Sequence, residues 1–194
     1  GSLMSLLRHA ILPNLVQTTE GQPVIVHTGP FGNIAHGCSS VVGDKLALGY
    51  ADFVLSEAGF GADLGFEKFM HIKARQSGLI PNAAVLVASV RALKWHGGAT
   101  RRSLETPDPE KVRAGAGNLV HHINAVGSFG VPVVVAINRF SADTDAELAA
   151  VQTAVNELGV AAIEANHWAE GSAGAAELAE HVVALADSGG AAFK

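Results

Sequence analysis

Five short stretches of the chain are apolar, and each is followed first by polar or glycine-bearing residues and then by a helical pattern. They are rich in valine, isoleucine and alanine, and their β-branched side chains suit the pleated surface of a sheet. These stretches cover residues 23–28, 50–55, 83–88, 131–137 and 160–163. Alternating strands and helices are typical of a parallel sheet with helices on both faces. We therefore predict an α/β fold with a doubly wound, mainly parallel five-stranded sheet.

Helix signals lie between and around these predicted strands. An apolar stripe predicts a helix over residues 3–15, which Pro13 interrupts, and a second stripe predicts a helix over residues 64–76. Short polar residues at a helix start accept hydrogen bonds from its first amides. Such start signals are found at Asp63, at the pair Asp108 and Pro109, and at the capping box of Thr144 and Glu147.

Length and composition narrow the class of protein. The 194 residues, 48% hydrophobic and 16% charged, predict one globular α/β domain over residues 3–194, and Gly1-Ser2 reads as a cloning scar. A net charge of −5 without a basic cluster argues against nucleic-acid binding. The single cysteine, Cys38, excludes an internal disulfide, and no apolar run is long enough to span a membrane. We expect a cytoplasmic protein.

The loop after the second predicted strand is rich in glycine. Gly59 and Gly61 flank Phe60, so the backbone is free to turn sharply and to approach a ligand closely. From this loop alone the ring of Phe60 is expected to fold back into the core, because exposed phenylalanine is disfavoured. The alternative is that the loop presents the ring to a ligand.

In open parallel sheets, ligands bind outside the carboxyl ends of the strands. The chemically distinctive residues all follow predicted strands: His36, Cys38, Ser39 and Ser40, then Phe60, then Arg91, Lys94 and Trp95, then Arg139 and Phe140, and finally His167 and Trp168. The aromatic side chains among them predict a wall suited to a flat ring system. The alternative is that these rings only close the top of the sheet.

Other motifs carry less information. A metal site at His36 and Cys38 would need two further ligands at suitable spacing, so we predict no metal site. The sequence contains neither a Gly-x-Ser-x-Gly elbow nor a Gly-x-x-x-x-Gly-Lys-Ser/Thr phosphate-binding loop.

Five runs of residues, in order along the chain, resemble formate–tetrahydrofolate ligase. They are residues 29–38 (GPFGNIAHGC), 57–65 (EAGFGADLG), 87–98 (VASVRALKWHGG), 133–140 (VVVAINRF) and 167–171 (HWAEG). The resemblance extends over essentially the whole chain.

The resemblance implies a specific activity. Members of this family join formate to tetrahydrofolate with ATP, through a formyl phosphate that the folate amine attacks. They use Mg²⁺ and a monovalent cation, and bacterial members are homotetramers. By resemblance, Phe140 and Trp168 stack on the folate, and Phe60, with Gly59 and Gly61, lines the formyl-phosphate pocket.

The chain also departs from the family. Family members are longer and carry an N-terminal phosphate-binding loop and a C-terminal portion that these residues lack, so we expect an internal domain that is inactive alone. Arg91 and Lys94 are the candidate anion stabilisers, although capping a helix or pairing with an acid explains them equally well. Further polar candidates are His36, Ser39, Ser40 and Asp63.

Two alternatives remain open from the sequence. The chain could be a non-catalytic α/β binding or assembly module, or a small independent nucleotide-binding enzyme. The second alternative predicts that the chain binds ATP, whereas a folate-binding domain binds a folate analogue, and calorimetric titration distinguishes the two.

Overall fold

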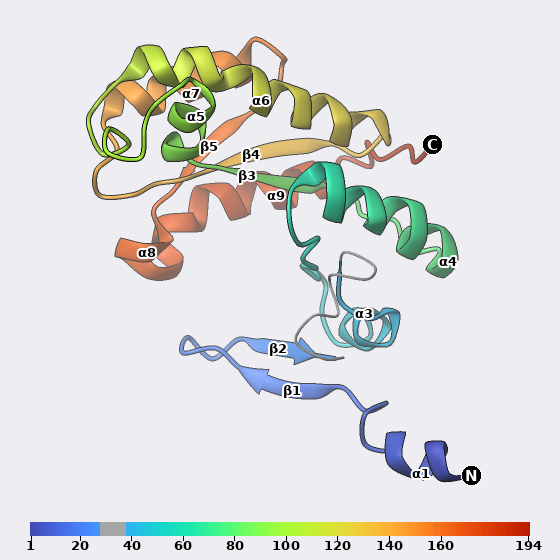
Figure 1. Cartoon of the computed structure of the whole chain (residues 1–194). Helices are drawn as coiled ribbons and strands as arrows, with labels where there is room; N and C mark the ends of the chain where they lie inside the picture. Colours follow the sequence, from blue (N-terminus) through green and yellow to red (C-terminus); the bar gives the residue numbers. More distant parts are fainter. Residues whose placement is uncertain (28–37) are drawn as a thin grey trace. The chain divides into compact units, whose positions relative to one another are not determined.

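The structure is a computed structural model that describes residues 1–27 and 38–194 (Figure 1). The chain divides into two compact units, Gly1–Ile80 and Pro81–Lys194. The single domain expected over residues 3–194 stays a prediction. Within the described part of the chain, no helix combines the length and the apolar character needed to cross a membrane.

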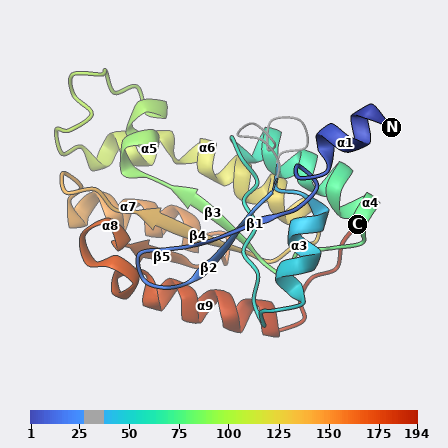
Figure 2. The ribbon, with the colours of Figure 1, turned by 90° about the horizontal axis from the view of Figure 1, so that it is seen from below.

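The second unit is built on a parallel sheet of three strands in the order β3-β4-β5 (Figure 2). The strands are β3 (Ala84–Ala88), β4 (Val133–Asn138) and β5 (Ala162–Ala165). In the register Leu86 pairs with Val135, and Val135 also pairs with Ala162. Four consecutive residues of the central strand are buried, as expected for a strand covered on both faces. Three of the five predicted strands are therefore confirmed.

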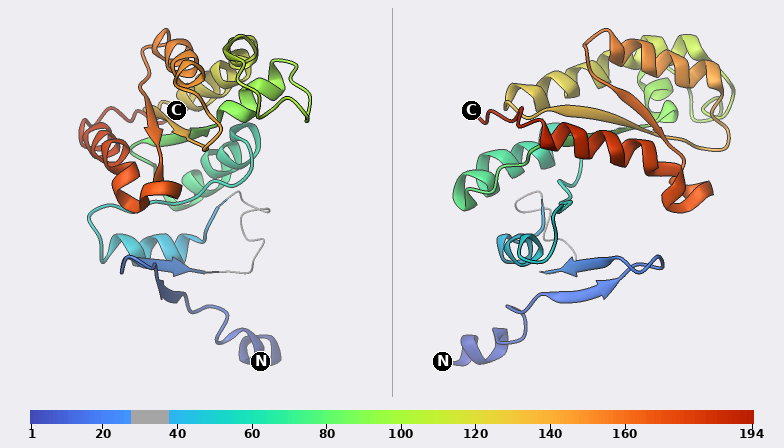
Figure 3. Two further views of the ribbon diagram at one scale, coloured as in Figure 1. Left: turned by 90° about the vertical axis from the view of Figure 1, so that its left-hand side faces the viewer. Right: turned by 180° about the vertical axis from the view of Figure 1, so that it is seen from behind.

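Helices cover both faces of this sheet. On one face lie α5 (Val90–His96), α6 (Pro109–Ser128) and α7 (Asp145–Asn156), and on the other lies α9 (Ala176–Asp187) (Figures 1 and 3). The core between the sheet and the first group consists of Ala88, Val90, Leu93, Val112, Ala116, Leu119, Ile123, Val135, Ile137, Leu148, Ala150, Val151 and Val155. Short helices, α8 (His167–Glu170) and η3 (Gly171–Ala175), link β5 to α9.

The predicted start signals of α6 and α7 are confirmed. The Asp108 carboxylate accepts a hydrogen bond from the Lys111 amide at 3.1 Å, and Pro109 occupies the first turn of α6. Thr144 and Glu147 form the reciprocal capping box at the start of α7. These caps fix where the loops after β3 and β4 end.

The first unit holds a two-stranded antiparallel sheet and several helical segments. The strands β1 (Asn14–Gln17) and β2 (Pro23–Val26) pair directly. The helical segments are α1 (Ser2–Leu7), α3 (Val41–Leu48), η1 (Ala62–Phe66), η2 (Phe69–Ala74) and α4 (Arg75–Ser77), of which η1 and η2 are π-helical.

A five-stranded parallel sheet is not found among the described residues. Only part of the predicted strand 23–28 forms, as β2, and it pairs antiparallel with β1 because a tight turn at Gly21 brings the two segments together. The predicted helix 3–15 forms only as α1, which ends at Leu7, and β1 occupies its last two residues. Pro13, directly before β1, cannot continue a helix. Residues 50–55 contain no strand. Apolar residues alone do not form a strand without a neighbour to pair with.

Candidate functional site

Phe140 lies on a tight turn directly after the central strand β4. Its backbone amide donates a hydrogen bond to Asp143 Oδ2 at 2.9 Å, and the Asp143 amide donates to the Phe140 carbonyl at 3.0 Å. Burial raises the pKa of Asp143, although the hydrogen bond from Phe140 acts to lower it. The Phe140 side chain is 49% exposed, so part of its ring is available to a ligand.

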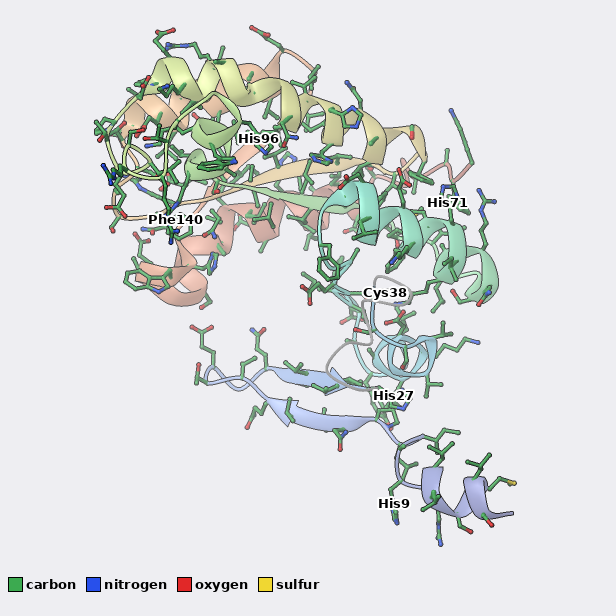
Figure 4. All side chains as sticks on the ribbon, viewed as in Figure 1. His9, His27, Cys38, His71, His96 and Phe140 are labelled. Carbon is green, nitrogen blue, oxygen red and sulfur yellow. The ribbon has the colours of Figure 1, made fainter. Side chains whose placement is uncertain are left out.

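Trp168 lies on the short helix α8, after the neighbouring strand β5. The Asn166 amide donates a hydrogen bond to the Gly174 carbonyl at 2.8 Å, and the Asn166 side chain donates to Glu170 at 2.7 Å. These bonds hold α8 at the end of the sheet where Phe140 lies (Figures 1 and 4). Trp168 is 85% exposed. Both rings therefore follow adjacent parallel strands and are exposed to solvent, and their contact with a folate stays a prediction.

A cavity of about 220 Å³ lies beside Phe140, at the carboxyl ends of β3 and β4. It is lined by Leu86, Val87, Ala88, Ser89, Ala92, Leu93, Asn118, Leu119, His122, Asn138 and Phe140. The Nδ1 atom of His122 is buried and has no hydrogen-bond partner among the described residues. A buried polar atom without a partner is costly and often marks the place of a water molecule or ligand.

Sequence reasoning did not identify Asn118 and His122 as candidates for a site. Both lie in the interior of α6, where the helical pattern alone made them appear ordinary. The available signal was their spacing, because residues four apart share one face of a helix. His122 is partly buried and Asn118 is exposed, and both line the pocket beside Phe140 next to the buried Leu119.

Lys94, one of the two candidate anion stabilisers, is enclosed in the second unit. Its ammonium group forms an ion pair with Glu147 at 2.8 Å and donates to the Thr106 carbonyl at 3.2 Å. Both side chains of the pair are almost completely buried. The other candidate, Arg91, is exposed on α5. The role of either residue towards an anion stays a prediction.

Glu147 is the centre of this buried network. Besides Lys94, its carboxylate accepts hydrogen bonds from the Asp108 amide at 2.9 Å and from the amide and hydroxyl of Thr144. Burial acts to raise the pKa of Glu147, but these hydrogen bonds outweigh it and lower the pKa to about 2. The carboxylate is therefore ionised and joins α5, the loop before α6 and the start of α7.

Phe60 belongs to the first unit and has an unusual backbone. Its φ angle is +68°, in the left-handed region that residues other than glycine rarely adopt, and its side chain is 63% exposed. The expectation that the ring folds back into the core is therefore wrong. Strained backbone of this kind is often found at functional sites. The gathering of Phe60 with the rings of the second unit stays a prediction.

The helical segment after Phe60 packs directly against the glycine loop. A Cβ atom added to Gly65 would lie 1.5 Å from the Gly59 carbonyl oxygen, so only glycine allows this approach. The segment begins at Ala62 with Gly61 at the cap position, and Asp63 lies in the first turn. The prediction that Asp63 caps this helix is therefore wrong. Because the helical segment begins two residues earlier than expected, the Asp63 carboxylate lies within its first turn and not at the cap.

The polar candidates after β2 lie in different surroundings. Ser40 caps α3 by accepting a hydrogen bond from the Gly43 amide at 2.9 Å, and its hydroxyl also contacts His27 Nδ1 at 2.5 Å. Ser39 is exposed, and His36 lies outside the described residues. Cys38 is buried, and burial raises the pKa of its thiol. No three His, Cys, Asp or Glu residues in the described ranges are grouped so that they could hold a metal ion.

A buried lysine that sequence reasoning missed supports the Phe60 loop. Lys73 forms an ion pair with Asp44, donates to Ser56 Oγ at 3.2 Å and lies 4.6 Å from the centre of the Phe69 ring. Ser56 begins the glycine-rich stretch that contains Phe60. Lys73 therefore connects the helical segment η2, the helix α3 and the start of this loop.

The fold and the position of these residues define a class of protein. It is an α/β protein whose second unit presents exposed rings and a partly polar cavity at the carboxyl ends of parallel strands, which is where such folds bind ligands.

Comparison with known proteins then gives the family. The model of the family "Formate--tetrahydrofolate ligase" matches residues 1–194. The chain is similar to proteins named formate–tetrahydrofolate ligase from Sphingobium sp. (55% identity over 193 residues), Granulibacter bethesdensis (54% over 194) and Rhizobium etli (57% over 193). These alignments cover 100% of this chain but only 35%, 34% and 34% of the respective relatives. The chain belongs to the formate–tetrahydrofolate ligase family and spans about a third of these relatives' length.

Proposed function

We propose that this chain supplies the folate-binding rings, and part of the formyl-phosphate pocket, of a formate–tetrahydrofolate ligase. The observation that carries the proposal is the pair of accessible rings, Phe140 and Trp168, at the ends of adjacent strands. A flat pterin has two faces to cover. Contact between aromatic rings contributes roughly 0.5–1.5 kcal/mol beyond the area it buries.

The cavity beside Phe140 supports the same proposal. A pterin carries hydrogen-bonding groups on its edge as well as apolar faces. The cavity offers an unpartnered imidazole nitrogen on His122 and the amide side chains of Asn118 and Asn138. A ligand that stacks on Phe140 can reach these groups, and this arrangement would favour a heterocycle over a purely apolar ring.

The Phe60 loop is proposed to enclose the formyl phosphate. A mixed anhydride needs a pocket that excludes water and donors that stabilise its negative charge. The exposed ring of Phe60, held between Gly59 and Gly61, would exclude water from this pocket. Arg91 and Lys94 are the cations proposed to stabilise its negative charge. The further polar candidates for this role are His36, Ser39, Ser40 and Asp63.

The remaining components of the reaction are proposed to bind outside this chain. The sequence has no phosphate-binding loop with its lysine. The described residues also offer no cluster of metal ligands. We therefore place ATP, Mg²⁺ and the monovalent cation on other parts of the complete ligase, a cytoplasmic homotetramer to which this chain contributes. The chain alone is proposed to be inactive, and formyl transfer by the purified chain with ATP would refute this.

The test uses alanine substitutions of the two rings in the complete ligase. We expect Phe140→Ala and Trp168→Ala each to raise the KM for tetrahydrofolate by about tenfold, because each removes one stacking surface. The KM for formate should change less than about twofold. Trp168→Phe, which keeps a ring, should retain most of the affinity, and Leu158→Ala, a control truncation in the turn after α7, should have no effect. An unchanged dependence on tetrahydrofolate in both ring variants would refute the proposal.

A non-catalytic binding module is the remaining alternative. It predicts that replacing Phe60, Arg91 or Lys94 in the complete ligase changes no kinetic constant, provided that the variants fold. Circular dichroism checks the fold of each variant before its kinetics are compared.

A further inference from the structure

Arg139 lies between strand β4 and the ring of Phe140, and its side chain reaches two other elements. Its Nη1 atom donates a hydrogen bond to Glu164 Oε1 on β5 at 2.7 Å. Its Nη2 atom donates to Asp145 Oδ1 at the start of α7 at 3.3 Å. One planar guanidinium group therefore connects the two elements that flank the Phe140 turn, through separate nitrogen atoms.

The backbone of Arg139 strengthens the same connection. Its amide donates a hydrogen bond to the Ala165 carbonyl at 3.1 Å, which extends the pairing of β4 with β5 by one residue. Glu164 precedes Trp168 by four residues, and Arg139 directly precedes Phe140. The ion pair therefore lies where strands β4 and β5 are last held together, just before the one leads to Phe140 and the other to Trp168.

A contribution to stability alone does not explain this arrangement. The side chains of Arg139 and Glu164 are each about one-third exposed, and that of Asp145 is 94% exposed. Ion pairs that water reaches contribute little to the free energy of folding. The hydrogen bond to Glu164 raises the pKa of Arg139, so its charge is permanent. Burial in this part of the unit belongs instead to the hydrophobic core, which includes Val135 and Ile137 of β4.

We propose that Arg139 is a positioning residue that sets the spacing and orientation of Phe140 and Trp168 through its contacts with Glu164 and Asp145. This inference rests on the proposed function of the two rings. A sandwich of two rings binds a flat ligand only when their separation matches its thickness. Two loops that leave neighbouring strands independently do not fix this separation.

The first variants remove or alter the fork of donors in the complete ligase. We expect Arg139→Gln to raise the KM for tetrahydrofolate roughly fivefold, with kcat and the KM for formate changed less than about twofold. Arg139→Lys keeps the charge but cannot bridge two carboxylates with a rigid fork, so an intermediate effect is expected. The matched control is Arg113→Gln, which breaks an exposed ion pair with Glu110 on α6 and should leave all constants unchanged.

Two further combinations separate positioning from general stability. Exchanging the charges with Arg139→Glu and Glu164→Arg together should recover part of the affinity that either change alone removes. In a Trp168→Ala background, Arg139→Gln should have a much smaller effect, because one of the two rings to be aligned is already missing. A purely structural role would give the same effect with and without Trp168.

The outcomes are distinct. If Phe140→Ala and Trp168→Ala raise the KM for tetrahydrofolate but Arg139→Gln and Arg139→Lys do not, the positioning role is wrong and the proposed function stands. If the ring variants have no effect, the proposed function itself fails. A fall in melting temperature with equal losses towards both substrates would also overturn the positioning role. Arg139→Lys provides the comparison if Arg139→Gln does not fold.

Discussion

The loops that carry Phe60 and Phe140 present their rings in different ways. Phe140 follows a strand that is paired on both sides, and its turn is closed by hydrogen bonds with Asp143. Phe60 follows a segment that belongs to no regular strand, apart from the isolated bridge between Cys38 and Ala58. The φ angle of Phe60 lies in the left-handed region. The preceding residue, Gly59, packs closely against Gly65 of the helical segment.

The difference shows two routes to an exposed ring. At Phe140 a sheet and a capped helix already fix both ends of the turn, so ordinary backbone angles suffice. At Phe60 the contact between Gly59 and Gly65 fixes the turn, and it holds Phe60 at a positive φ angle that is energetically unfavourable. A buried lysine also lies near each loop, Lys94 near the Phe140 turn and Lys73 near the Phe60 loop. Three experiments test this comparison.

The largest effect is expected from removing the lysine behind the Phe140 turn. Lys94→Met leaves the fully buried Glu147 carboxylate without its counter-charge, which should lower the free energy of unfolding by about 3–5 kcal/mol. Lys73→Met should cost less, because its partner Asp44 is 11% exposed and water reaches it. Urea unfolding of the chain, followed by circular dichroism, measures both.

The matched control for this prediction is Lys94→Met combined with Glu147→Leu. It removes both charges and should recover much of the loss. A loss below about 1 kcal/mol in Lys94→Met alone would mean that Glu147 is not held as an ionised, buried carboxylate.

The pH dependence of stability gives the next largest effect. Because the pKa of Glu147 is lowered from 4.5 to about 2, its contribution of about 3 kcal/mol is present above 4.5 and is lost as the pH falls towards 2. The raised pKa of Asp143 acts in the opposite direction, since its contribution is lost as the pH rises. The stability difference between the unchanged chain and Glu147→Gln, measured by urea unfolding from pH 7 to pH 2, should therefore shrink on acidification. A constant difference would contradict the lowered pKa.

The smallest effect concerns the backbone at the two rings. Phe60→Gly should be more stable than Phe60→Ala by about 1 kcal/mol, because glycine adopts a positive φ angle without strain. At Phe140, where φ is not positive, the order should reverse, with alanine more stable than glycine by about 0.5–1 kcal/mol. Thermal unfolding of the four variants tests this, and the same order at both positions would remove the distinction between the loops.

The parts of the fold that sequence predicted correctly are those governed by local rules. The strands β3, β4 and β5 were found from their apolar runs, and the run is longest in β4, which is buried on both faces, whereas Val85 and Val87 of β3 are exposed. The starts of α6 and α7 were found because capping depends on residues within one turn. The placement of Phe140 and Trp168 at one edge of the sheet was predicted because parallel strands direct their exit loops to the same edge.

The parts that sequence did not predict depend on contacts between distant segments. Residues 50–55 have the composition of a strand, but composition does not specify a partner. The pairing of Lys94 with Glu147 could not be found, because each residue also has an ordinary local explanation as an exposed helix residue or a capping-box member. The cap predicted at Asp63 lies two residues earlier, at Gly61, because the contact between Gly59 and Gly65 determines where the helical segment begins.

The hydrogen bond from the Asp108 amide to Glu147 joins residues that are 39 positions apart and encloses the whole of α6 and β4. In topological terms it acts as a reversible crosslink, which closes a long loop of chain without a covalent bond. The segment within that loop is therefore expected to open and close as one cooperative unit. Protonation of this one buried carboxylate would therefore loosen the closure of the loop, while the pairing of β4 with both neighbouring strands keeps the segment folded.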